Sequence, residues 1–178
     1  LVQAQCQQEI KRGGQVFFVH NKVKTLESQA AWLRELLPVA DIRVAHGQME
    51  RKALEQIILS FYRREFQVLV CTTIIENGID LPNANTILID NAQNFGLAQL
   101  YQLRGRVGRS HQQGYCTILI PPGGLPRDAL LRINALQRFS TLGAGFSIAS
   151  ADMELRGVGN LLGREQSGHI SAVGLDTY

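Results

Sequence analysis

The chain of 178 residues lacks the motifs that hold a nucleoside triphosphate unaided. It contains no Gly-Lys dipeptide, hence no GxxxxGK(S/T) loop, and no GxGxxG follows an apolar run. In a P-loop, backbone N–H groups cradle the phosphates while the lysine and the hydroxyl residue reach the terminal phosphate and Mg²⁺. The sequence therefore excludes a P-loop ATPase that is complete within this chain.

Cysteine, methionine and long apolar runs are also scarce. Cys6, Cys71 and Cys116 lie far apart without a CxxC spacing, which predicts reduced thiols in a cytoplasmic protein and no metal site. No apolar run approaches the length of a membrane span, so we expect no membrane partner. The only methionines are internal, Met49 and Met153, and we therefore expect a piece of a longer protein.

Basic charge is unevenly distributed along the chain. The net charge is +3 at pH 7. Residues 1–100 hold ten basic and ten acidic residues, whereas residues 101–178 hold eight arginines, no lysine and five acids. Arginine presents a planar fork of donors that matches phosphate oxygens. The excess is compatible with a nucleic-acid partner but does not establish one.

Strand and helix patterns alternate over the first two thirds of the chain. Continuous apolar runs, typical of strands buried on both faces, occur at 15–20, 42–46, 67–72, 86–90 and 115–120. Helical patterns occur at 2–14, 26–37, 54–61 and 96–103. This alternation predicts right-handed βαβ units and a parallel α/β sheet.

A PPGG stretch at 121–124 interrupts the alternation. A helix is predicted after it, with the inward positions Ala129, Ile133, Leu136 and Phe139. A GAG turn follows at 143–145, and a second helical region lies near 151–163. We therefore expect a sheet domain at 1–122 and an appended helical hairpin at 123–178.

Polar residues follow three of the predicted strands at their carboxyl ends. They are HNK at 20–22, HGQ at 46–48 and TT at 72–73, each just before a helix. Ligands of an open parallel sheet bind at this edge, and helix N-termini there attract anions. Each segment alone is equally compatible with capping or core packing, but the three together predict a row of phosphate sites.

Two further stretches are dense in candidate site residues. The segment at 102–109, QLRGRVGR, is either a solvated basic turn or a phosphate-binding segment. The second interpretation follows because glycine permits close approach of the backbone to a ligand and arginine binds phosphate oxygens. TTIIENGIDLP at 72–82 is either an acid-capped loop or a contact to a ribose or an arginine. Arginines suited to phosphoryl transfer without a P-loop indicate half of a two-domain motor.

The motifs VFFVHN, HGQM, CTTIIENGIDLPNANTILIDNAQNFGLAQLYQLRGRVGR and ADMELRGVGNLLGREQSG occur in this order. With them, nearly the whole chain resembles the second RecA-like motor domain of the bacterial transcription-repair coupling factors, which are superfamily-two DNA translocases. The RecG translocases are the next most similar family. The resemblance implies an α/β fold, namely a RecA-like doubly wound parallel sheet with an appended C-terminal helical hairpin. Residues 151–168 resemble the translocation element that these two families share.

The resemblance implies a role for each matched residue. Arg106 and Arg109 would be arginine fingers directed at the γ-phosphate of ATP held by another domain. The other implied nucleotide-binding residues are Gln102, Glu76, Gly78 and Asp80. The implied contacts to the DNA backbone are Asn21, His46, Gly47, Thr72 and Thr73. Arg156 and Gln166 would couple the nucleotide state to DNA movement.

The resemblance also implies a function. The chain would be the C-terminal half of an ATP-driven translocase on double-stranded DNA that displaces stalled RNA polymerase and recruits excision-repair proteins. ATP and Mg²⁺ would be bound mainly by an upstream RecA-like domain of the same chain, so the fragment alone would be inactive. The alternatives are a RecG-type fork-reversal translocase, a passive nucleic-acid-binding module and a nucleotide-sensing domain. The intact pair Arg106 and Arg109 argues against a passive module, because phosphoryl-directed arginines have no purpose without ATP.

Overall fold

The computed structural model describes residues 1–73, 84–108, 113–138 and 145–162. Within them, five parallel strands form one sheet in the order β2-β3-β1-β4-β5. The strands are β1 (Gln15–Val19), β2 (Ile42–Ala45), β3 (Val68–Cys71), β4 (Ala84–Ile89) and β5 (Tyr115–Ile118). The α-helices are α1 (Val2–Lys11), α2 (Leu26–Leu36), α3 (Arg51–Tyr62), α4 (Leu97–Arg104), α5 (Arg127–Arg138) and α6 (Gly145–Leu162). The 3₁₀ turns are η1 (Val23–Thr25) and η3 (Ala92–Asn94). The predicted RecA-like α/β sheet is confirmed.

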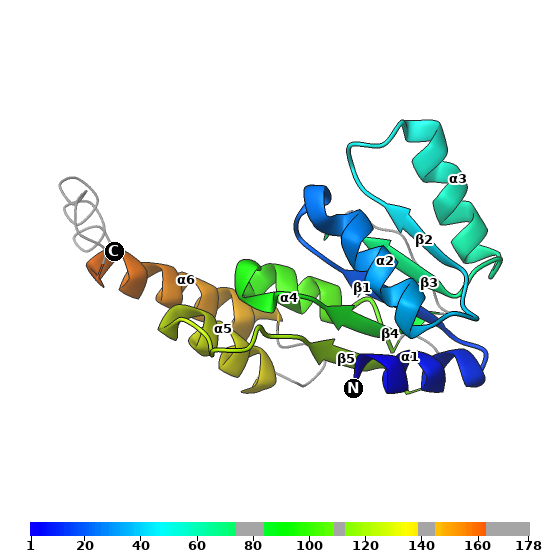
Figure 1. The fold of residues 1–178 in the computed structure, drawn as a ribbon. Helices are drawn as coiled ribbons and strands as arrows, with labels where there is room; N and C mark the ends of the chain where they lie inside the picture. Colours follow the sequence, from blue (N-terminus) through cyan, green and yellow to red (C-terminus); the bar gives the residue numbers. More distant parts are fainter. Residues whose placement is uncertain (74–83, 109–112, 139–144, 163–178) are drawn as a thin grey trace.

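Helices cover both faces of the sheet, and β1 lies at its centre (Figure 1). Alternate residues of β1 enter two separate cores. Phe17 and Val19 pack on the side of α3 and α4, whereas Val16 and Phe18 pack on the side of α1 and α2. All five residues of β1 are buried, which explains why the sequence shows a continuous apolar run instead of an alternation.

Helix α3 is held to the sheet by aromatic packing. The ring of Phe61 lies between Phe17 and Phe66, with centroid distances of 5.3 Å and 5.0 Å. Gln15 joins the same region, because its Nε2 donates to the backbone oxygens of Phe61 and Phe66 at 2.8 Å and 2.7 Å. The end of α3 is therefore fixed by buried rings and by a buried amide.

Helices α5 and α6 lie side by side and extend beyond α4, away from the sheet (Figure 1). Ala129, Ile133 and Leu136 are buried, as the sequence predicts, together with Ile148 of α6. Arg132 Nη2 donates to the backbone oxygen of Gln93 at 2.9 Å and so ties α5 to the turn η3.

Several element boundaries differ from the prediction, among them the starts of β4 and α6. Strand β4 begins at Ala84 instead of residue 86, because the buried polar residue Asn85 interrupts the apolar signal before Thr86. Helix α6 begins at Gly145, where the sequence predicts a turn, since glycine and serine at a helix start resemble a loop in composition. The predicted inward position Phe139 lies outside the described residues.

All three cysteines are free thiols. Burial raises the pKa of Cys6 to about 11, with a smaller contribution from the charge of Glu9. Burial also raises the pKa of Cys116 to about 11 against the lowering effect of Arg104, and it raises the pKa of the fully buried Cys71 further. Among the described helices, none is long and apolar enough to span a membrane.

Candidate nucleotide and DNA site at the carboxyl edge of the sheet

The strand register brings the predicted polar segments to one edge of the sheet. Val19 pairs with Cys71 and with Ile89, and Cys71 pairs with Ala45, so four strands end at the same level. The residues that follow these ends are Asn21 after β1, His46 and Gly47 after β2, and Thr72 and Thr73 after β3. Because β2, β3 and β1 are neighbours, these five residues form a row along the edge.

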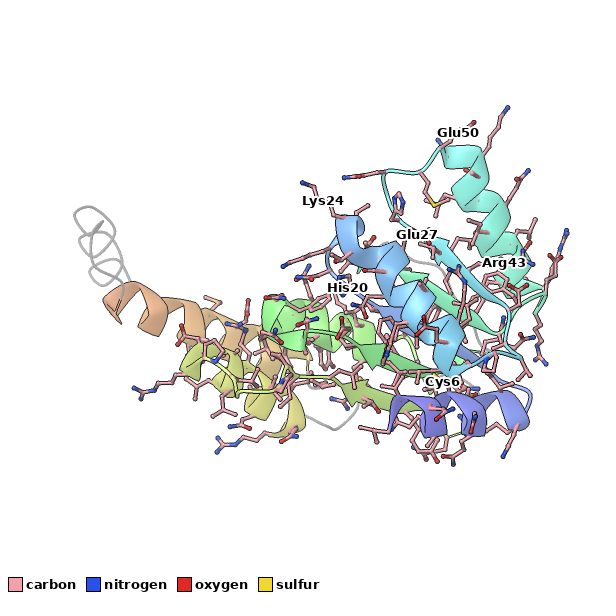
Figure 2. The ribbon with its side chains drawn as sticks, viewed as in Figure 1. Cys6, His20, Lys24, Glu27, Arg43 and Glu50 are labelled. Carbon is pink, nitrogen blue, oxygen red and sulfur yellow. The ribbon has the colours of Figure 1, made fainter. Side chains whose placement is uncertain are left out.

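Two atoms in this row are buried without a hydrogen-bond partner among the described residues. They are Oδ1 of Asn21 and Nδ1 of His46. A buried polar atom without a partner is costly, and it is typical of a site that a ligand completes. Lys24 is an exposed residue of the turn η1, which follows β1, and it lies above His20 in the view of Figure 2. The row and Lys24 together thus present amide, imidazole and ammonium groups, which are suited to binding an anion.

The buried residue His20 supports the carboxyl edge of the sheet through two side-chain hydrogen bonds. His20 is 4% exposed, and its Nδ1 lies 2.7 Å from Oδ2 of Asp90 while its Nε2 lies 2.7 Å from Oγ1 of Thr25. In the neutral ring Nδ1–H donates to the carboxylate and Nε2 accepts from the threonine hydroxyl. Both ring nitrogens are therefore engaged, and His20 supports the edge instead of contacting a ligand.

The contacts of Asp90 continue as far as helix α5. Asn91 Nδ2 donates to Oδ2 of Asp90 at 2.8 Å, and Gln93 Nε2 donates to Oδ1 of Asn91 at 3.0 Å. Since Arg132 of α5 donates to the backbone oxygen of Gln93, hydrogen bonds run without a break from η1 to the appended helices. Asn91 adopts a left-handed conformation with φ of 51°, which asparagine tolerates better than most residues.

The arginine motif follows helix α4. Leu97, Leu100 and Leu103 are buried and anchor the helix, while Gln102 is exposed and Arg106 is half-buried. The chain then leaves α4 through a turn in which the N–H of Arg106 donates to the oxygen of Leu103 at 3.0 Å. The predicted finger Arg109 lies outside the described residues.

Five other predicted site residues fall wholly or partly outside the described part of the chain. Glu76, Gly78, Asp80 and Gln166 lie outside the described residues. Arg156 lies on α6, where its position along the helix is described and its side chain is not.

The sequence analysis missed His20, Thr25 and Asp90 as organisers of this edge. A polar signal was present in the sequence, because His20 opens the HNK segment and Asp90 ends the fourth apolar run. The hydrogen bond between His20 and Asp90 could not be predicted from the sequence, because the two residues are 70 positions apart.

A protein-family model for the helicase conserved C-terminal domain matches residues 1–111. The chain therefore belongs to the helicase C-terminal domain family. Its five-stranded parallel sheet, covered by helices on both faces, is the RecA-like fold of that family.

Curated relatives are transcription-repair-coupling factors from many bacteria. The chain is 53% identical to the factor of Myxococcus xanthus over 100% of this chain and 15% of that protein. It is 52% identical to the factor of Escherichia coli K12 over 96% of this chain and 15% of that protein. It is 48% identical to the factor of Mycobacterium tuberculosis over 99% of this chain and 14% of that protein. The chain thus spans about a seventh of the length of these relatives.

Solved structures agree with this assignment. RecG bound to a three-way DNA junction matches with a TM-score of 0.73 and 36% identity over 90% of this chain and 21% of that chain. Domain 2 of the DEAD-box helicase Mss116p matches with a TM-score of 0.62 over 79% of this chain and 54% of that chain. At 20% identity, the latter likeness shows the fold alone.

Asp90→Ala should destabilise the chain by about 1–3 kcal/mol, because it leaves the buried Nδ1 of His20 and Nδ2 of Asn91 without their shared carboxylate acceptor. Urea unfolding measures the change. The control is Glu27→Ala, whose side chain is 74% exposed and whose removal should change stability by less than about 0.5 kcal/mol. Equal losses in the two variants would contradict the organising role of Asp90.

Proposed function

We propose that the chain is the second motor domain of an ATP-driven translocase on double-stranded DNA, acting in the displacement of stalled RNA polymerase during transcription-coupled repair. The upstream RecA-like domain of the full protein would bind ATP and Mg²⁺. The present chain would supply arginines to the nucleotide and backbone contacts to the DNA. Recruitment of excision-repair proteins would fall to other domains.

One observation carries the proposal. Identity of 48–53% to transcription-repair-coupling factors extends over 96–100% of the chain, whereas the helicase family model ends at residue 111. The similarity therefore includes α5 and α6, which lie beyond the part that the general helicase model matches. We propose that residues 1–122 form the motor core and that residues 123–178 form a coupling unit attached to it.

The geometry of the edge supports a contact to phosphates. The row of Asn21, His46, Gly47, Thr72 and Thr73 presents polar groups, and two buried atoms in it have no hydrogen-bond partner among the described residues. Contacts of this kind position a protein on nucleic acid without reading its sequence. The arginines after α4 are suited to the charge that develops during phosphoryl transfer.

A RecG-type fork translocase is the second candidate. The RecG structure matches 90% of this chain with a TM-score of 0.73, so the fold is compatible with that function. Its identity of 36% is lower than the 48–53% of the coupling factors, which favours the first proposal. Release of a stalled RNA polymerase by the full-length protein separates the two candidates, since a fork translocase would not perform it.

Arg109→Ala in the full-length protein should lower kcat for ATP by at least about 100-fold and leave ATP binding nearly unchanged, because a finger acts mainly in the transition state. Arg106→Ala should act in the same direction. Steady-state ATPase and nucleotide titration measure the two effects. The matched control is Arg127→Ala, an exposed arginine of α5. An unchanged kcat in both motif variants would refute the finger assignment.

DNA binding should be independent of base sequence and should weaken steeply with salt, because each phosphate contact contributes about −0.9 to the slope of log K against log salt. Fluorescence anisotropy measures the affinity for two duplexes of unrelated sequence at salt concentrations from about 50 to about 200 mM. Asn21→Ala should weaken binding to both duplexes equally, whereas Asn134→Ala on α5 should change neither. Discrimination between the duplexes at high salt would contradict the proposed phosphate contacts.

Arg156→Ala and Gln166→Ala should leave substantial DNA-stimulated ATPase but abolish triplex displacement, because we propose that these residues transmit closure of the nucleotide cleft to DNA. The measured quantity is the ratio of translocation to ATP hydrolysis at unchanged melting temperature. Arg138→Ala, at the end of α5, is the control. A ratio at the wild-type value in both variants would remove the coupling role.

A further inference from the structure

The chain that follows β1 forms a short loop that is closed at its base by side-chain and backbone contacts. His20, the first residue after the strand, places its Nε2 2.7 Å from Oγ1 of Thr25, five positions further along the chain. Thr25 also donates its backbone N–H to the oxygen of Lys22 at 3.2 Å. The two ends of the loop therefore meet, and they enclose residues 21–24, which we call the β1 loop.

The base of the β1 loop is fixed to the sheet on both sides. The N–H of His20 donates to the backbone oxygen of Cys71 in β3 at 2.9 Å, and the N–H of Asp90 donates to the oxygen of Val19 at 2.8 Å. The ring of His20 adds its contact to Oδ2 of Asp90 at 2.7 Å. Since His20 is 4% exposed while Thr25 is exposed, the loop has a buried support at one end and meets solvent at the other.

The β1 loop carries two lysines and no acidic residue. Lys22 and Lys24 are both exposed, and neither forms an ion pair with another residue in the described part of the chain. Asn21 precedes them and belongs to the polar row at the carboxyl edge. One amide and two ammonium groups, all hydrogen-bond donors, thus follow a single buried strand. The two ammonium groups repel each other, and an anion that lies close to both offsets this repulsion.

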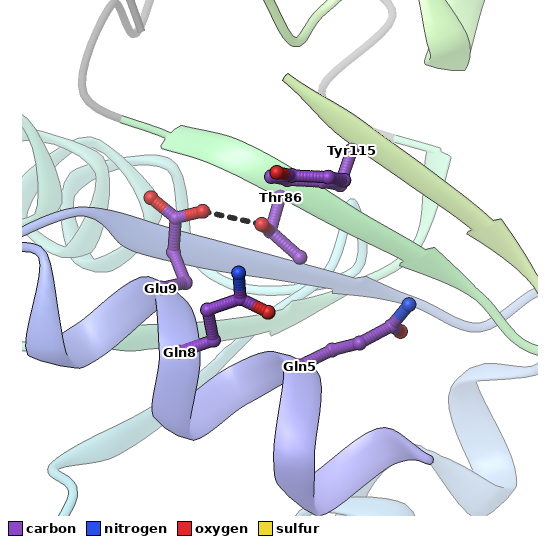
Figure 3. A pocket seen from close by; sticks show the side chains of 5 residues that line it. All are labelled: Gln5, Gln8, Glu9, Thr86 and Tyr115. Carbon is purple, nitrogen blue, oxygen red and sulfur yellow. Dashed lines mark hydrogen bonds between the residues drawn. The ribbon is translucent and has the colours of Figure 1, made fainter. Parts of the chain in front are cut away.

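The opposite edge of the sheet has a polar pocket of a different character. There Glu9 of α1, which is 1% exposed, faces Thr86 with Tyr115 above it (Figure 3). Its Oε2 accepts hydrogen bonds from the hydroxyl of Thr86 and from Nη2 of Arg12. None of the lining residues is basic; they are Gln5, Gln8, Glu9, Thr86 and Tyr115. A carboxylate repels a phosphate group, so this pocket is unsuited to one, in contrast to the β1 loop.

We infer that the β1 loop binds the phosphodiester backbone of DNA, with Lys22 and Lys24 as phosphate contacts and Thr25, through its bond to His20, as a positioning residue. The inference rests on the proposed function and adds these three residues to the row of DNA contacts. Ammonium groups neutralise phosphates and release counterions, a contribution that does not depend on base sequence. A loop that is already closed loses less conformational freedom when it binds, so the contact between His20 and Thr25 favours affinity.

Lys22→Gln and Lys24→Gln in the full-length protein test the phosphate contacts. Each should lower the affinity for a DNA duplex and reduce the magnitude of the slope of log K against log salt by about 0.9, because each removes about one contact. The double variant should reduce it by about 1.8. Fluorescence anisotropy over a salt series measures both quantities. The matched control is Lys11→Gln, an exposed lysine at the end of α1 ahead of β1, which should change neither.

Thr25→Val tests the positioning role, because valine keeps the branched shape and removes the hydroxyl that contacts His20. We expect duplex affinity to fall about 5-fold at unchanged melting temperature, and to fall little further in the variant that lacks both Lys22 and Lys24. Thr25→Ser keeps the hydroxyl and should restore the affinity. The control is Ser28→Ala, whose hydroxyl donates to the backbone oxygen of Thr25 at 2.7 Å, and it should leave the affinity unchanged.

The outcomes separate a failure of the inference from a failure of the proposed function. If Asn21→Ala weakens DNA binding while both lysine variants keep the wild-type affinity and slope, the row binds DNA and the β1 loop does not. If all three variants bind as the wild type does, the proposed DNA edge fails and the inference fails with it. A loss of ATP affinity in place of DNA affinity would assign the loop to the nucleotide and overturn the inference. Equal losses from Thr25→Val with and without the lysines, together with a lower melting temperature, would show a merely structural role for Thr25.

Discussion

The pairing of β1 with both β3 and β4 is the constraint on which the rest of the structure depends. Val19 pairs with Cys71 on one side and with Ile89 on the other, so the strands on both sides of the centre end together. If the register of β1 shifted by one residue, Phe17 and Val19 would face the opposite side of the sheet, away from their core. The polar residues that follow the strands would then no longer lie at the same level. The register therefore fixes the two hydrophobic cores and the candidate site in one step.

Polar side chains at both edges of the sheet tie neighbouring elements to it. At the carboxyl edge, His20 and Asp90 begin a series of hydrogen bonds that reaches Arg132 of α5. At the opposite edge, Glu9 and Arg12 tie α1 to the junction of Gly108 with Gly114. The appended helices and the arginine motif are thus each attached to the sheet by specific, directional contacts in addition to apolar packing.

Much of this architecture could be predicted from the sequence, because a strand buried on both faces leaves a continuous apolar run and a helix leaves a 3.6-residue period. The prediction was imprecise at β4, where Asn85 and Thr86 are buried but polar, and at α6, where Gly145 begins a helix. Segments of the candidate site were also recognisable, since polar residues after buried strands mark a ligand edge. The contacts within it were not, because His20 with Asp90 and Arg12 with Gln113 join positions 70 and 101 residues apart that only the folded sheet brings together.

The raised pKa values of the three thiols have a practical consequence for labelling this domain. Thiolates, not thiols, attack maleimides and related reagents, and the pKa of about 11 of Cys6 and of Cys116 keeps both side chains almost entirely in the thiol form near neutral pH. Cys71, fully buried inside β3, is less reactive still. A cysteine introduced on an exposed helix face would therefore accept a fluorophore or spin label in preference to all three native thiols. Distances across the domain could then be measured in a chain whose packed core keeps its natural sequence.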